Sequence, residues 1–242
     1  MISKVYRVVA YVFFLVVFTY TIGFLAGHVV PKGVDDGPVV PAWQAVLINA
    51  ALLGLFAVQH SVMARPGFKR RWTRIVSPSV ERSTYVLTAS AAVALLLWQW
   101  KPLPDPVWTV GPQWARVTLW GLYLFGWGFL VLSTFALGHF ALFGLRRESP
   151  EFREPRLYRL VRHPIMVGFL IAFWAVPDMS VGRLLFAGAS TAYILVGVRL
   201  EEQDLKNELG TPYERYLART PRFIPRPARH REVADVRETA RQ

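Results

Sequence analysis

The chain has 242 residues, of which 53% are hydrophobic, and its mean hydropathy is +0.31. This composition is too apolar for a typical soluble domain of this size, and the absence of cysteine excludes disulfides, thiolate nucleophiles and cysteine metal sites. A net charge of +12 suggests nucleic-acid binding in a soluble protein, but in a membrane protein it indicates loops that face anionic lipid. We therefore expect a lipid bilayer, and no nucleic acid, as a partner.

Six apolar segments follow one another along the chain, and their length and composition indicate membrane-spanning helices. The alternating pattern of a β-barrel strand is absent. We predict an all-α integral membrane protein with five or six transmembrane helices, the number depending on whether the 13-residue fifth segment crosses fully. The segments are Val5–Val30, Trp43–Met63, Ser83–Trp100, Val117–Leu145, Pro164–Val176 and Met179–Val198.

The connections between these segments refine the prediction. The fourth segment is long, and its last part, "HFALFGL", is expected to leave the bilayer or lie along its surface. The fifth and sixth segments are joined by "VPDM", Val176–Met179, which indicates a tight helical hairpin. We expect residues 1–225 to form one polytopic domain, with a cofactor region at about 139–225, and residues 226–242 to form a disordered cytoplasmic tail.

The basic residues lie mostly on one side of this predicted arrangement. The N-terminus, the connections at 64–82 and 142–163, and the region from Arg199 onward hold 24 of the 28 lysines and arginines. By the positive-inside rule, both termini and both basic connections are cytoplasmic. We expect an integral protein of the inner, cytoplasmic membrane, with its cofactor pocket on the cytoplasmic side.

Two glutamates, Glu201 and Glu202, follow the sixth apolar segment directly. The helix is predicted to continue to Leu209 and to stop at Gly210, which is a favourable C-cap followed closely by Pro212. Carboxylates near the C-terminal end of a helix are not favoured by its dipole. The two glutamates are therefore expected either to form salt bridges with the basic loops or to meet a bound cation.

The hairpin places a second polar group beside these glutamates. It brings the start of the fifth segment close to the end of the sixth, so that Arg162, His163 and Pro164 are expected near the two carboxylates. Pro164 suits the first turn of a helix, where a missing N–H costs nothing. Together these residues predict a pocket with acidic and basic groups at one membrane interface.

Other polar residues lie inside the apolar segments. His60 is near the basic end of the second segment and His139 lies within the fourth, and such residues either line a cavity or form hydrogen bonds between helices. No two of the five histidines have the spacing of a metal-binding helix, and we expect no metal site. Glycine-rich nucleotide-binding patterns are also absent.

The C-terminal half resembles a known family. "LYRLVRHPIMVG", followed after the hydrophobic hairpin by "EEQDLKNELGTPYERYLARTPRFIP", resembles the isoprenylcysteine carboxyl methyltransferase superfamily over Tyr158 to Pro225. The earlier blocks "QHSVMARPGFKRRWTR", "WQWKPLP" and "HFALFGLRR" resemble the membrane methanethiol S-methyltransferases, which are related to denitrification accessory proteins. The resemblance implies methyl transfer from S-adenosylmethionine to a small lipophilic thiol, giving dimethyl sulfide from methanethiol.

The resemblance also implies site residues. The cofactor is expected to be bound by Tyr158, Arg162, His163, Pro164, Glu201 and Glu202. A carboxylate suits the ammonium group of the cofactor, and a guanidinium suits its carboxylate. The acceptor thiol must lose its proton, so a base is useful. The catalytic candidates are His163, His60, His139 and Arg199.

The sequence departs from the family pattern at two positions, and two other functions remain open. Met166 stands where family members often have Tyr, and Ala141 stands where an acidic residue is frequent. The alternatives are methylation of another lipophilic acceptor, such as an isoprenoid or prenylcysteine-like carboxylate, and a non-enzymatic membrane accessory role.

Overall fold

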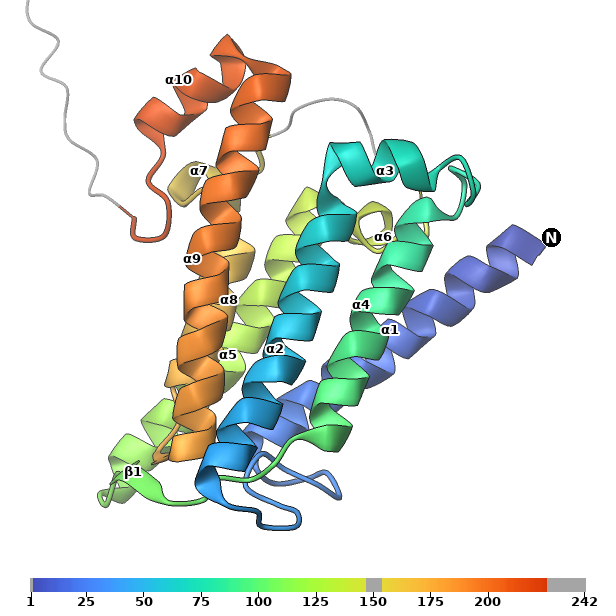
Figure 1. Ribbon diagram of the computed structural model, residues 1–242. Helices are drawn as coiled ribbons and strands as arrows, with labels where there is room; N and C mark the ends of the chain where they lie inside the picture. Colours follow the sequence, from blue (N-terminus) through green and yellow to red (C-terminus); the bar gives the residue numbers. More distant parts are fainter. Residues whose placement is uncertain (1, 147–153, 226–242) are drawn as a thin grey trace, which may run out of the picture.

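The computed structural model describes residues 2–146 and 154–225, and nearly all of its regular structure is helical (Figure 1). The prediction of an all-α integral membrane protein is confirmed in this general form. Four of the described helices are long and apolar enough to cross a membrane: α1 (Ile2–Ala26), α2 (Ala42–Ala64), α5 (Gln113–Leu137) and α9 (Val181–Leu209).

Two other helices correspond to the remaining apolar segments. The third segment forms α4 (Glu81–Gln99), 19 residues that pack against α1 and α2. The fifth segment forms α8 (Pro164–Trp174), which has only 11 residues. The shorter elements are α3 (Pro66–Trp72), α6 (His139–Leu142), α7 (Arg156–Leu160), α10 (Thr211–Arg219), β1 (Pro106–Thr109) and β2 (Asp178–Ser180).

The fourth apolar segment is not one continuous helix. Helix α5 ends at Leu137, and Gly138 has a φ of 109°, in the left-handed region that glycine adopts without steric cost. The chain then turns into the four-residue α6, beginning at His139. The main helix thus ends just before the "HFALFGL" stretch, and the expectation that this stretch leaves the bilayer or lies along its surface stays a prediction.

Helix α8 is held mainly by α5. A Cβ atom added at Gly126 would lie 2.7 Å from the backbone nitrogen of Ala172, and one added at Gly168 would lie 2.7 Å from the carbonyl oxygen of Gly126. The two backbones thus approach each other without intervening side chains, as small residues allow in membrane helix pairs. Helix α8 also contacts α9, its expected hairpin partner, but the contact with α5 is the more extensive one.

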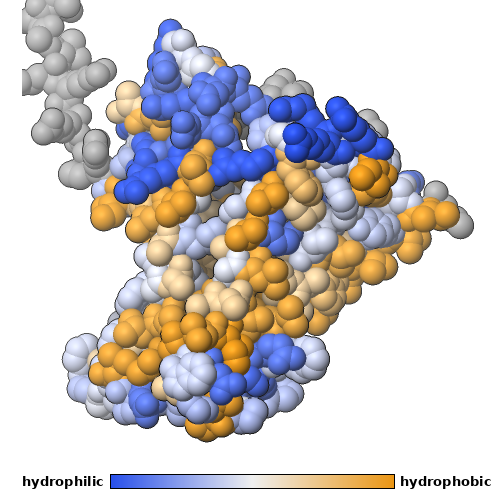
Figure 2. Space-filling view, in the orientation of Figure 1, coloured by the Kyte–Doolittle hydropathy of each residue, from blue (hydrophilic) through white to orange (hydrophobic). Residues whose placement is uncertain are grey.

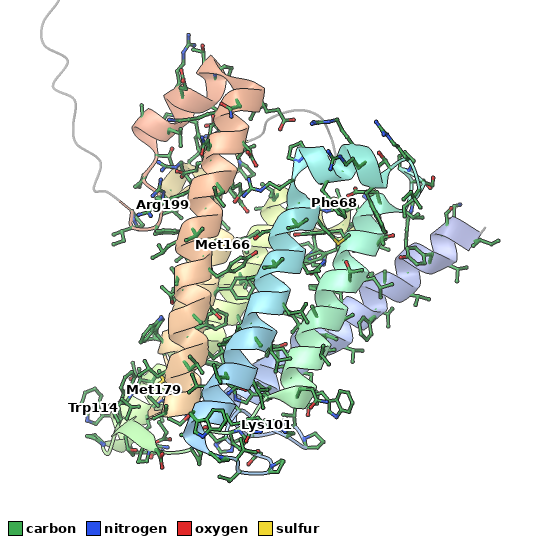
Figure 3. The ribbon with its side chains drawn as sticks, viewed as in Figure 1. Phe68, Lys101, Trp114, Met166, Met179 and Arg199 are labelled. Atoms are coloured by element: carbon green, nitrogen blue, oxygen red, sulfur yellow. The ribbon has the colours of Figure 1, made fainter. Side chains whose placement is uncertain are left out.

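A two-stranded antiparallel pairing closes one end of the bundle, where the sequence predicted only a tight turn. Strand β2 follows α8 and pairs with β1, with Thr109 opposite Asp178. The connection after α1 joins this end through Arg183, whose Nε donates to Asp35 at 2.9 Å and whose Nη1 donates to the carbonyl of Leu25 at 2.6 Å. Figure 3 shows Lys101, Trp114 and Met179 in the same region. We call this the strand end.

The opposite end carries the helices α3 and α10, and we call it the basic end. Figure 2 shows hydrophilic residues gathered over these two helices, and hydrophobic residues over the middle of the molecule. The core between the two ends is built from aromatic and small apolar side chains contributed chiefly by α1, α4, α5 and α8. Its most deeply buried members include Phe24, Trp100, Tyr123, Trp127 and Ala172.

Candidate active site

The start of α8 is fixed at the basic end by the chain that follows α10. The backbone N–H of Arg162 donates to the carbonyl of Pro221 at 2.9 Å, and that of His163 donates to the carbonyl of Arg222 at 3.3 Å. Pro164 is buried at the first position of α8, as the sequence predicted. These contacts hold the Arg162 and His163 side chains against the end of α9.

Glu202 is the centre of a buried charge cluster. Its side chain is 8% exposed, and Oε1 accepts from Nε of Arg162 at 2.8 Å and lies 3.1 Å from Nε2 of His163. Arg222 also donates to both oxygens of this carboxylate. We call Glu202, Arg162, His163 and Arg222 the Glu202 cluster. The sequence predicted that Arg162, His163 and Glu202 lie close together, and in the structure Arg162 and His163 both contact Glu202.

Four of the five N–H donors of Arg162 are engaged within this geometry. Its Nε and Nη2 are directed at Glu202, and its Nη1 donates to the carbonyls of Leu217 and Thr220. The side chain is 10% exposed. A buried pair of this kind fixes geometry, because removing either partner leaves an uncompensated charge.

Glu201 differs sharply from its neighbour. Its side chain is 53% exposed, and its nearest ion-pair partner is Nδ1 of His163 at 3.8 Å. It also lies within electrostatic range of Arg82 on α4 and of Tyr158 on α7. Glu201 is thus accessible to solvent, yet it is surrounded by polar groups from several elements, which is the arrangement required for binding a cationic ligand.

Two tyrosines connect the short helices beneath this carboxylate. The Tyr216 hydroxyl donates to the carbonyl of Tyr158 at 2.6 Å, and the Tyr158 hydroxyl reaches the carbonyl of Ser133 at 3.4 Å. Burial raises the pKa of Tyr216 to about 12. Burial also raises the pKa of Tyr158, and the nearby Glu201 carboxylate raises it further. Both hydroxyls therefore remain protonated donors at neutral pH.

The other candidate histidines lie outside the Glu202 cluster. His139 is buried; its Nε2 lies 2.8 Å from the Tyr11 hydroxyl, its Nδ1 lies 2.8 Å from the Thr134 hydroxyl, and its ring stacks on Phe135. These contacts agree with a hydrogen bond between helices. His60 lies on α2, with the hydroxyl of Tyr85 2.7 Å from its Nε2.

Arg199 and Met166 also lie outside the Glu202 cluster. Arg199 is exposed on the outer side of α9, and no side-chain hydrogen bond or ion pair joins it to another residue in the described ranges (Figure 3). Met166, where the family pattern has a ring, is partly exposed on α8. Arg222 and Tyr216 were not singled out from the sequence, although both lie in the second part of the family pattern.

The structure offers no group of three or more potential metal ligands in residues 2–146 and 154–225. The polar groups gathered at the basic end are carboxylates, guanidinium groups, imidazoles and tyrosine hydroxyls.

Comparison with known proteins places the chain. The family model described as NnrU protein matches residues 47–222, which include every residue of the Glu202 cluster. The chain belongs to the NnrU protein family. No solved structure matches it.

Curated relatives of this NnrU family member carry more specific names. This chain is 51% identical over 236 residues to a methanethiol S-methyltransferase of Mycobacterium tuberculosis, and the match covers 93% of this chain and 97% of the relative. It is 47% identical over 231 residues to a methanethiol S-methyltransferase of a Pseudomonas species, covering 91% and 89%. Human nurim is 31% identical over 176 residues, covering 65% and 67%.

Proposed function

We propose that this chain transfers a methyl group from S-adenosylmethionine to methanethiol and so forms dimethyl sulfide. The observation that carries the proposal is its 51% identity, over nearly the full length of both chains, to a protein named methanethiol S-methyltransferase. The basic end supports it, because Glu201 presents an accessible carboxylate beside His163. When bound, S-adenosylmethionine supplies a methyl group made electrophilic by its sulfonium.

The residues at the basic end fit the ammonium group of this cofactor, but they change the role expected of Arg162. The accessible carboxylate of Glu201 suits the ammonium group through a charge-assisted hydrogen bond. Arg162 is engaged by Glu202 and by carbonyl groups, so we assign it to positioning. The charge of Arg82 also acts on Glu201, and its Nε donates to the carbonyl of Leu142 at 2.8 Å, so we propose Arg82 as a second guanidinium that borders the site.

The remaining members of the predicted site have supporting roles in this proposal. His163 lies between the two glutamates and orients both carboxylates. Pro164 starts α8 and fixes the direction of the chain at that point. Tyr158, one wall of the site, contributes a protonated hydroxyl on the side toward α5.

We also propose the membrane arrangement. Helices α1, α2, α4, α5 and α9 would cross the bilayer, and α8 would reach only part of the way, because 11 residues at about 1.5 Å each are too short. The positive-inside rule would place the basic end on the cytoplasmic side of the inner membrane. Residues 1–225 would act as one domain, and the proposed tail 226–242 lies outside the described residues.

The decisive experiment uses the detergent-purified full chain. Incubation with methanethiol and S-adenosylmethionine should release dimethyl sulfide into the headspace, measured by gas chromatography, and calorimetry should detect binding of S-adenosylmethionine alone. Cofactor binding without product, together with activity on a larger thiol or on a prenylated carboxylate, would replace methanethiol with that acceptor. The absence of cofactor binding would favour an accessory role.

A further inference from the structure

His60 and Tyr85 form a polar pair inside the helix bundle that the site described above does not use. The Tyr85 hydroxyl lies 2.7 Å from Nε2 of His60 and 3.0 Å from Nδ1. Tyr85 is buried on α4, whereas His60 on α2 is only partly buried. A buried hydroxyl facing an imidazole makes a short path for a proton.

The surroundings of His60 are mostly aromatic. Its ring centroid lies 5.2 Å from that of Phe56 and 6.3 Å from that of Tyr193, in addition to 5.0 Å from that of Tyr85. The Tyr193 hydroxyl is within 3.2 Å of the Ser61 hydroxyl, which ties α9 to α2 at this level. Aromatic neighbours of this kind suit contact with a small apolar molecule better than with a charged one.

Tyr85 connects this aromatic region to the proposed cofactor site. The guanidinium of Arg82 lies 5.3 Å from the centroid of the Tyr85 ring. The charges of Arg82 and Glu201 both act on the Tyr85 hydroxyl, and so does the neighbouring Tyr193. The charge at Glu201 therefore acts on Tyr85, whose hydroxyl contacts His60.

The two other histidines near the basic end are less suited to accept a proton. His139 contacts the hydroxyls of Tyr11 on α1 and Thr134 on α5, and not that of Tyr85. His163 has a carboxylate facing each ring nitrogen, Glu201 at 3.8 Å from Nδ1 and Glu202 at 3.1 Å from Nε2. His60 has a hydroxyl as its hydrogen-bond partner, and a neutral imidazole is the form that accepts a proton.

We propose that His60, acting through the Tyr85 hydroxyl, accepts the proton of the acceptor thiol. This inference rests on the proposed methyltransferase function. The S–H bond breaks as the thiol proton moves to the Tyr85 oxygen and the Tyr85 proton moves to Nε2 of His60. The new S–CH3 bond forms from the thiolate electron pair, and the electron pair of the broken methyl–sulfonium bond stays on the departing sulfur. His60 then returns its proton to water.

The test compares His60→Asn and Tyr85→Phe with His28→Asn, a histidine exposed near the strand end. With methanethiol, each of the first two variants should lose kcat by about 100-fold or more, the usual contribution of general acid–base catalysis. With methaneselenol, which is already ionised at neutral pH, both should approach the wild-type rate. The profile of kcat against pH should show a limb that depends on a histidine in the wild type and in His28→Asn. This limb should be missing in His60→Asn.

A second readout does not depend on turnover. Because the chain contains no cysteine, an S–H stretching band in the infrared spectrum belongs to the bound thiol alone. With methanethiol and S-adenosylhomocysteine bound, this band should weaken in the wild type and persist in His60→Asn. Calorimetric binding of S-adenosylmethionine at wild-type strength confirms that each variant is folded.

The outcomes separate the two proposals. If the wild type forms no dimethyl sulfide, the proposed function fails. If the wild type is active but His60→Asn loses thiol and selenol turnover equally, or loses neither, only the assignment of His60 is overturned. The same holds if the S–H band is as weak in His60→Asn as in the wild type. If His60→Asn does not fold, the selenol comparison in Tyr85→Phe decides alone, because this variant keeps the buried ring.

Discussion

The pairing of charged side chains differs between the two ends of the molecule. At the strand end, Arg183 is bound to Asp35, Arg116 is bound to Asp178, and Lys32 donates to backbone carbonyl groups. At the basic end, Glu202 is just as completely paired, but the adjacent Glu201 is not. Paired charges hold connections in place at both ends, and the basic end also places the accessible carboxylate of Glu201 directly beside the buried Glu202 cluster. The comparison points to the basic end as the one that binds a charged ligand.

The largest expected effect comes from breaking the Glu202 cluster. Glu202→Ala leaves Arg162 buried without its partner, and we expect a loss of about 3–5 kcal/mol in the free energy of unfolding, because uncompensated buried charges are strongly destabilising. Thermal unfolding in detergent measures it, with Glu208→Ala on the exposed face of α9 as the control. Similar losses in the two variants would show that the cluster does not hold the basic end together.

The sequence predicted the local features of this end correctly. Pro164 begins α8, and α9 ends at Leu209 with Gly210 as its C-cap, because proline geometry and the absence of a glycine side chain act within a single turn. The general neighbourhood of His163 and Glu202 also followed from the chain doubling back. These features depend on short stretches of chain.

The sequence could not distinguish the two glutamates. Adjacent residues on a helix point in directions about 100° apart, so their partners depend on which elements pack against each face. Arg222, which binds Glu202, comes from the chain beyond α10, and the resemblance gave it no role. The close contact of α5 with α8 through Gly126 and Gly168, and the pairing of β1 with β2, likewise depend on tertiary packing.

A smaller effect, on binding rather than stability, is expected at the accessible carboxylate. Glu201→Gln should weaken S-adenosylmethionine binding by about 1.5–3 kcal/mol, the usual value of a hydrogen bond to a charged group, while leaving thermal unfolding nearly unchanged. Isothermal titration calorimetry measures the binding, and Glu208→Gln provides the matched control on the same helix. Wild-type affinity in Glu201→Gln would remove this residue from the proposed site.

The smallest expected effect is at the strand end and depends on pH. Hydrogen bonds from Arg116 hold the pKa of Asp178 below its ordinary value of 3.8. The stabilisation is therefore fully present above that ordinary value and disappears as the pH falls through the lower pKa of the folded state. Since Asp178 is 46% exposed, solvent screening limits the contribution to less than about 1 kcal/mol.

The matching experiment compares thermal unfolding of the wild type, Asp178→Asn and Asp105→Asn as the pH is lowered from neutral. Asp178→Asn should unfold at a slightly lower temperature at neutral pH, and the difference should vanish in acid, whereas Asp105→Asn, an exposed aspartate in the same region, should follow the wild type throughout. Cofactor binding should be unchanged in both variants, because β1 lies at one end of α9 (Figure 1) and Glu201 belongs to the other, C-terminal end of that helix. A loss of cofactor binding in Asp178→Asn would mean that the two ends are coupled and that their charges do not act separately.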